Sequence, residues 1–101
     1  MWLMVFFDLP VGTKPERRAA TRFRHFLRDD GYMMLQYSVY ARVCRAEDAV
    51  DKHVRRVVSN LPDSGSVRAL QVTDRQFGRM RVLLGKAPKS KTVGANQMVL
   101  L

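Results

Sequence analysis

The first apolar segment of the chain has hydrophobic residues at every position, not at alternate ones. Residues 2–7 read WLMVFF, and the run ends at Asp8, with Pro10 and Gly12 just beyond it. A short run of aromatic and β-branched residues bounded by turn residues predicts a β-strand. Because both alternating sets of side chains are apolar, we expect this strand to be central and covered on both faces. A carboxylate at the end of so apolar a strand then requires an explanation.

Two later segments have their apolar residues at helical spacing instead. Residues 13–30 carry an apolar stripe and begin with Thr13 and Glu16, which have the spacing of a capping box. Residues 46–61 repeat the helical pattern, and their stripe includes His53. We interpret His53 as a hydrogen-bonded histidine at the edge of the core, not as a metal ligand. The pattern therefore predicts two helices.

The remaining hydrophobic segments predict strands. The expected elements are two strands or one bent strand within residues 32–44, a strand over residues 67–73, a turn over residues 74–78 and a short fifth strand over residues 79–84. The break or bend in residues 32–44 is expected near Ser38 or Tyr40, since the segment is too long for one straight strand.

The order of these elements is the β-α-β-β-α-β order of an α+β, ferredoxin-like domain, followed by the short fifth strand. We expect the domain to span residues 1–84, and residues 85–101 to form a flexible C-terminal tail with an apolar end. In such a domain both helices lie on one face of the sheet. The apolar side chains on the other face then need cover from outside the chain, which predicts a homodimer formed through the sheet faces.

Composition adds a strong positive charge to this picture. The 101 residues include 18 Lys and Arg against 9 Asp and Glu, a net charge of +9. A clustered excess of this kind favours a polyanionic partner, nucleic acid first and an anionic membrane surface second, over a merely solvated basic surface. The single cysteine excludes an internal disulfide, and no apolar run is long enough to cross a bilayer. We expect a cytoplasmic protein that has no membrane segment.

The basic residues gather in residues 14–28 and again in residues 75–81. Like charges four residues apart, such as Arg18 and Arg22, destabilise a helix, and backbone phosphates would offset that repulsion. The residues predicted to contact nucleic acid are Lys14, Arg17, Arg18, Arg22, Arg75 and Arg79. The aromatic-rich RNA-binding signature is absent, although Tyr32, Tyr37 and Tyr40 lie on strands where such platforms occur. Binding should therefore follow the backbone and its shape, not base sequence.

Asp8 stands at the end of the predicted central strand, unlike the other acidic residues. It either caps the following turn through its own side chain or binds a metal. In a two-fold dimer, two Asp8 carboxylates can share one Mg²⁺ (or Mn²⁺) that also takes phosphate oxygens. Such a metal would polarise a phosphate and activate a water molecule. Asp8 is therefore the predicted catalytic and metal-binding residue.

Three blocks of sequence together resemble the CRISPR-associated protein two family, most of all its type II members. The blocks are FFDLP, RFRHFLRDDGYMMLQYSVYARV and VRALQVTDRQFGRM, and the resemblance extends to about Leu84. It implies a ferredoxin-like homodimer that acts in CRISPR adaptation. Its implied partners are the integrase, CRISPR-associated protein one, and short duplex DNA. The apolar end of the tail is a predicted docking segment for that integrase.

The resemblance also implies a metal-dependent endonuclease activity on DNA or RNA, with Asp8 as the metal ligand. Many members of the family have tyrosine just before that aspartate, whereas this chain has Phe7 and lacks the hydroxyl. Three functions follow from the sequence: an adaptation scaffold, a metal-dependent nuclease that can be toxin-like and unrelated to adaptation, and a ferredoxin-like RNA-binding module without sequence preference.

Overall fold

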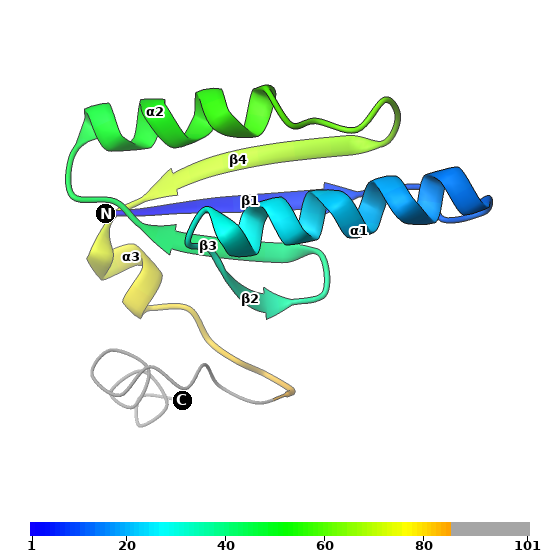
Figure 1. Cartoon of the computed structure of the whole chain (residues 1–101). Helices are drawn as coiled ribbons and strands as arrows, with labels where there is room; N and C mark the ends of the chain where they lie inside the picture. Colours follow the sequence, from blue (N-terminus) through cyan, green and yellow to red (C-terminus); the bar gives the residue numbers. More distant parts are fainter. Residues whose placement is uncertain (86–101) are drawn as a thin grey trace.

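The structure, a computed structural model, describes residues 1–85 and contains one antiparallel sheet with helices on both of its faces (Figure 1). The elements in chain order are β1 (Trp2–Asp8), α1 (Lys14–Asp29), β2 (Met33–Gln36), β3 (Val39–Val43), α2 (Glu47–Val58), β4 (Ser66–Val72) and α3 (Asp74–Gly78). The strand order is β2-β3-β1-β4, so β1 is central, as predicted. The α+β, ferredoxin-like fold is confirmed, and the predicted break near Ser38 separates β2 from β3.

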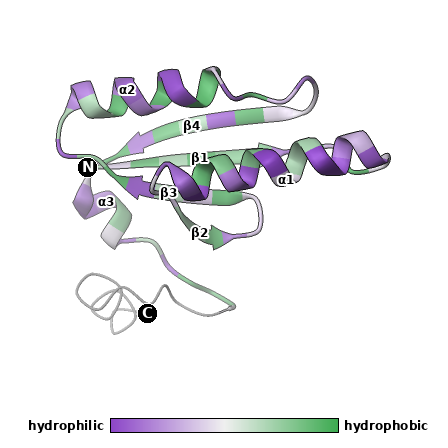
Figure 2. Cartoon of the chain, viewed as in Figure 1, coloured by the Kyte–Doolittle hydropathy of each residue, from purple (hydrophilic) through white to green (hydrophobic). Residues whose placement is uncertain are grey.

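The larger core lies between the sheet and the two long helices. Leu3, Val5 and Phe7 of β1 are buried there against Phe23 and other apolar residues of α1 and α2. Each such side chain contributes roughly 1.5–3 kcal/mol through burial. Figure 2 shows hydrophobic and hydrophilic residues alternating along α1 and α2. Each helix therefore has an apolar side, and that side packs on the sheet. This core fixes the direction in which the polar side of α1 faces.

The first turn of α1 is the one that the sequence predicted. Thr13 Oγ1 accepts from the Glu16 amide at 3.3 Å, and Glu16 Oε1 accepts from the Thr13 amide at 2.9 Å. After the helix, Gly31 has a φ of +92°, and a Cβ there would lie 2.8 Å from Arg42 Nη1. The positive φ therefore favours glycine at this position, and the Arg42 guanidinium lies beside it.

The opposite face of β1 carries Trp2, Met4 and Phe6, and α3 covers one end of it. The ring of Phe77 stacks on that of Trp2 with the centroids 3.9 Å apart. Phe77 also packs with Met4 and Ala41 in a second, smaller core. The expectation that this face depends wholly on cover from outside the chain was therefore wrong, because Phe77 covers the Trp2 end. Phe6 packs against the same core but stays only half-buried.

The segment after β4 departs most from the prediction. Residues 74–78 form α3 instead of a turn, because Thr73 and Gln76 make a second capping box with bonds of 2.9 and 3.1 Å. Residues 79–84, predicted to be a fifth strand, form no strand within the part of the chain that the structure describes. Met80 packs against the smaller core, whereas Leu83 and Leu84 are 89% and 97% exposed. The apolar end of the tail lies outside the described residues.

A buried polar cluster joins α1, β3 and α2 around Asp30. His53 Nδ1 lies 2.8 Å from one Asp30 carboxylate oxygen, and Arg56 Nη1 donates to the other at 2.7 Å. Arg42 donates to the Asp30 carbonyl oxygen. Burial acts to raise the pKa of Asp30, but the hydrogen bonds and charges of His53 and Arg56 outweigh it and hold that pKa below its usual value. His53 is a buried, hydrogen-bonded histidine, as predicted.

We expect Asp30→Asn to lower the free energy of unfolding at neutral pH by about 1–3 kcal/mol, because the buried His53 and the half-exposed Arg56 lose their carboxylate partner. The folded-state pKa lies below the unfolded value of about 4. The stabilisation is therefore complete above that pH and is lost as the pH falls through the folded-state pKa. Denaturant unfolding across this pH range measures it. Asp29→Asn, which removes the exposed neighbouring carboxylate, is the control, and equal losses from the two variants would contradict the account.

Candidate functional site

Asp8 is the last residue of β1, and its side chain is exposed. It pairs with Ser66 of β4, and strand alternation places it on the same face as Phe6, opposite the two long helices. Gly65 comes just before Ser66, at the end of the loop between α2 and β4. It has a φ of +108°, and a Cβ there would lie 2.8 Å from the Asp8 carbonyl oxygen. Glycine thus allows the α2–β4 loop to pass directly beside the end of β1.

The turn after Asp8 is held by other groups. Within residues 1–85 no hydrogen bond to the Asp8 carboxylate is found, whereas Arg17 Nη1 donates to the Val11 carbonyl oxygen at 3.1 Å. The turn-capping interpretation of Asp8 thus finds no support. Within the same residues no three His, Cys, Asp or Glu side chains are close enough to hold a metal together. Asp8 stays a predicted metal ligand, and no hydrogen bond within the described residues occupies its carboxylate oxygens.

The basic residues of α1 form a continuous exposed surface. Lys14, Arg17, Arg18 and Arg22 are all exposed on this helix. Arg17, Arg18 and Arg22 line a shallow groove on the helix surface together with Thr21 and His25. The structure therefore brings together the arginines that the sequence predicted as phosphate contacts, within about two turns of helix.

The other two predicted contacts lie elsewhere. Arg75 and Arg79 are exposed in and just after α3. Figure 1 places α3 beside the N-terminus, whereas the start of α1 lies at the opposite end of the sheet. The six predicted residues therefore make two separate basic groups, and the one on α1 lies at the same end of the sheet as Asp8.

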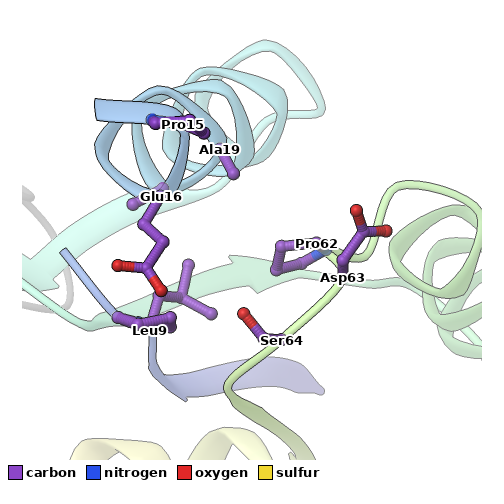
Figure 3. Close-up of a pocket in the computed structure, with 9 residues that line it drawn as sticks. Leu9, Pro15, Glu16, Ala19, Pro62, Asp63 and Ser64 are labelled. Atoms are coloured by element: carbon purple, nitrogen blue, oxygen red, sulfur yellow. The ribbon is translucent and has the colours of Figure 1, made fainter. Parts of the chain in front are cut away.

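A small pocket beside the end of β1 has different chemistry. It has a volume of about 170 Å³ and is lined by Leu9, Pro10, Pro15, Glu16, Ala19, Ala20, Pro62, Asp63 and Ser64. Figure 3 shows Leu9 and Glu16 across from the α2–β4 loop that carries Asp63. Its charged side chains are the carboxylates of Glu16 and Asp63, and Asp8 does not line it. It is therefore not a site for a polyanion.

The contact between Arg24 and Tyr37 was not predicted from the sequence. Arg24 of α1 lies with its guanidinium carbon 3.9 Å from the ring centroid of Tyr37 and 5.5 Å from that of Phe7. The sequence predicts Tyr37 on a strand, but it lies in the turn between β2 and β3, and its contact with Arg24 depends on how this hairpin meets α1. The arrangement is a cation–π contact, a type of contact that also recognises bases.

Membrane insertion finds no support in the described part of the chain, where none of the helices combines the length and the apolar character that a membrane span needs.

Comparison with known proteins gives consistent relatives. The family model described as CRISPR associated protein Cas2 matches residues 1–80. A protein of Acidovorax ebreus (strain TPSY) named CRISPR-associated endoribonuclease Cas2 is 50% identical over 101 residues, covering 99% of each chain. A protein of the same name from Flavobacterium psychrophilum is 40% identical over 100 residues, covering 99% of this chain and 87% of the relative. The crystal structure of Streptococcus pyogenes Cas2 at pH 6.5 has a TM-score of 0.62 at 22% identity, covering 82% of this chain and 99% of that chain, and shows the shared fold.

The α1 surface predicts binding to duplex DNA that depends strongly on salt and little on sequence. Each phosphate that the protein neutralises contributes about −0.9 to the slope of log affinity against log salt concentration. The triple variant with alanine at Arg17, Arg18 and Arg22 should therefore bind unrelated duplexes equally weakly and show a shallower slope.

Its control replaces three exposed basic residues outside this surface, Arg45, Lys52 and Arg55, with alanine, which removes the same charge. Fluorescence anisotropy with two unrelated duplexes at several salt concentrations measures both variants. Equal weakening by the two triple variants would show that net charge, and not the α1 surface, drives the binding.

Proposed function

The chain belongs to the Cas2 family of CRISPR-associated proteins, and we propose that it acts in CRISPR adaptation as a dimeric scaffold that binds duplex DNA and an integrase. The observation that carries this proposal is the exposed row of arginines on α1. Arginine suits phosphate because its planar guanidinium donates two parallel hydrogen bonds. A surface of this kind holds a duplex by its backbone without reading its bases.

The dimer is supported by apolar side chains that stay exposed on the α3 face of the sheet. Leu70 of β4 lies opposite Met4 on this face and is 52% exposed. Phe6 packs against the core of Met4, Ala41 and Phe77 but is only half-buried. A second copy packed here would bury these side chains and would leave both α1 surfaces free to hold DNA. Stable interfaces of this type bury about 1,600 Å² in total.

A nuclease activity is the second candidate function, and the position of Asp8 favours it. The curated relatives are named endoribonucleases, and Asp8 lies on the face through which we propose that two copies meet. There, two Asp8 carboxylates would approach each other and offer the oxygen ligands that Mg²⁺ or Mn²⁺ prefers. A metal ion bound to them would supply the positive charge that activates water for attack on a phosphodiester of RNA or DNA.

The phenylalanine before Asp8 bears on this second function. The Phe7 ring is buried in the helix-facing core, where it contacts Phe23 edge-on with the centroids 5.1 Å apart. Residue 7 therefore points to the opposite face of the sheet from Asp8. A hydroxyl at this position would not share the face of Asp8, so its absence takes no group away from the proposed metal site.

The dimer predicts a sedimentation mass of twice the 11.6 kDa chain at micromolar concentration. Leu70→Arg should shift the protein to monomer, because a charge would be buried in the interface without a partner. Val58→Arg, at an exposed apolar position on α2, is the matched control and should stay dimeric. A folded monomer for the unaltered chain, or a dimer that survives Leu70→Arg, would contradict the proposed interface.

Asp8→Asn should abolish any Mg²⁺- or Mn²⁺-dependent cleavage of RNA and DNA, because the metal loses its charged ligand. Binding to duplex DNA should be unchanged or stronger, since one negative charge per subunit leaves a basic protein. Asp51→Asn makes the same charge change at an exposed position on α2 and should keep full activity. Cleavage by purified Asp8→Asn protein at the rate of the unaltered chain would place the activity elsewhere.

A further inference from the structure

The small pocket beside the end of β1 differs in charge from the surface around it. Its charged lining residues are Glu16 and Asp63, and both are acidic. The shallow groove on α1 and the hollow between α1 and the β2–β3 hairpin are instead lined by arginines. In a chain with a net charge of +9, this pocket is therefore a negatively charged site, and such a site attracts a cationic group.

The remaining wall of the pocket is mostly apolar. It is formed by Leu9, Pro10, Pro15, Ala19, Ala20 and Pro62, with Ser64 beside them. The volume of about 170 Å³ is smaller than the roughly 300–1,000 Å³ of a site for a drug-sized ligand, so a single long side chain is a better match. Lysine and arginine lay an apolar stem along apolar surface and keep a charged head outside it. Their chemistry therefore fits an apolar wall that carries two carboxylates.

Both carboxylates are in place to meet a cation. Glu16 Oε1 accepts from the Thr13 amide at 2.9 Å, and this bond holds the carboxylate in position while leaving its second oxygen. Asp63 is exposed, and none of the ion pairs found among residues 1–85 involves it. Figure 3 shows Glu16 extending from α1 toward Leu9, with Asp63 across from it on the α2–β4 loop. A cation held between α1 and this loop would therefore meet two negative charges.

The backbone beside the pocket does not favour an anion instead. The start of a helix binds anions through N–H groups that have no partner within the helix. Here the Glu16 amide donates to Thr13 Oγ1, the Arg17 amide donates to the Thr13 carbonyl oxygen at 3.0 Å, and Pro15 has no N–H. The amides of residues 15–17 are thus used or missing, and the carboxylates determine the charge that the pocket accepts.

The neighbouring duplex surface decides which partner is expected. Glu16 precedes Arg17, so the pocket and the arginine groove adjoin on one helix. A second protein that holds the same duplex also presents basic groups, and like charges across an interface oppose association. An acidic pocket beside the DNA offsets that repulsion. A second copy of this chain is the weaker candidate, since Leu70 and the apolar side chains that favour a dimer lie on the opposite face of the sheet.

We propose that this pocket receives a long basic side chain of the integrase, with the stem along the apolar wall and the charged head between Glu16 and Asp63. A basic side chain that fills a pocket is a common anchor of a protein interface. This inference rests on the proposed scaffold function, and it names the surface of this chain that the integrase contacts.

The experiment measures binding of this chain to the purified integrase of the same CRISPR system by biolayer interferometry without DNA. Asp63→Lys should weaken the affinity by about tenfold or more, mainly through faster dissociation, because the incoming cation meets a like charge. Asp51→Lys makes the same charge change at an exposed position on α2 and should leave the affinity unchanged. Binding of blunt duplex DNA should not fall in either variant, since each adds positive charge.

A second variant tests the shape of the pocket without a change of charge. Ala19 lies on the α1 wall, and Figure 3 shows its side chain directed toward the loop at Pro62. Ala19→Leu fills this space with a side chain that suits a helix, so the fold should be kept, as circular dichroism and thermal unfolding would show. This variant should weaken integrase binding as Asp63→Lys does, with the affinity for duplex DNA unchanged.

The outcomes separate this inference from the proposed function. An unaltered chain that fails to bind the integrase would overturn both. Integrase binding that survives either Asp63→Lys or Ala19→Leu would overturn the inference alone. Equal weakening by Asp51→Lys would do the same, because net charge would then drive the association. A change from dimer to monomer in the sedimentation of Asp63→Lys would assign the pocket to a second copy and would also overturn it.

Discussion

The burial of β1 on both of its faces is the interaction on which the rest of the structure depends. Toward the helices, Leu3, Val5 and Phe7 anchor α1 and α2, and this packing sets the direction of the arginines on α1. On the opposite face the cover is incomplete, because Phe6 stays half-buried against the Phe77 core and Leu70 is 52% exposed. That remaining apolar surface is the physical reason for expecting a second copy, and Asp8 lies at its edge because it ends the same strand.

The packing of α1 on the core allows this helix to carry several positive charges. A row of arginines on one helix repels itself, and the packing of Phe23 and Leu27 into the core offsets that repulsion. The polar cluster of Asp30, His53 and Arg56 adds a second restraint, because it ties the end of α1 to α2. The arginines are therefore presented by a rigid element, so phosphates meet groups that are already in place.

Much of the fold could be predicted from local signals. The unbroken apolar run predicts a central β1, and the spacing of Thr13 and Glu16 predicts the start of α1, because each signal acts within a few residues. The helix α3 was missed since its capping pair, Thr73 and Gln76, lies in a short polar segment that resembles a turn. The predicted fifth strand does not form, because no strand of the described chain pairs with residues 79–84.

The candidate sites also differ in how far they could be predicted from the sequence. The arginine row follows from helical spacing along a single element, whereas the contact of Arg24 with Tyr37 depends on the β2–β3 hairpin meeting α1. The most direct test of the central claim is a titration with blunt duplex DNA, followed by the NMR signals of arginine side chains. The account predicts that Arg17, Arg18 and Arg22 shift strongly while Arg55 on α2 does not. Equal shifts at Arg55, or none on α1, would contradict it.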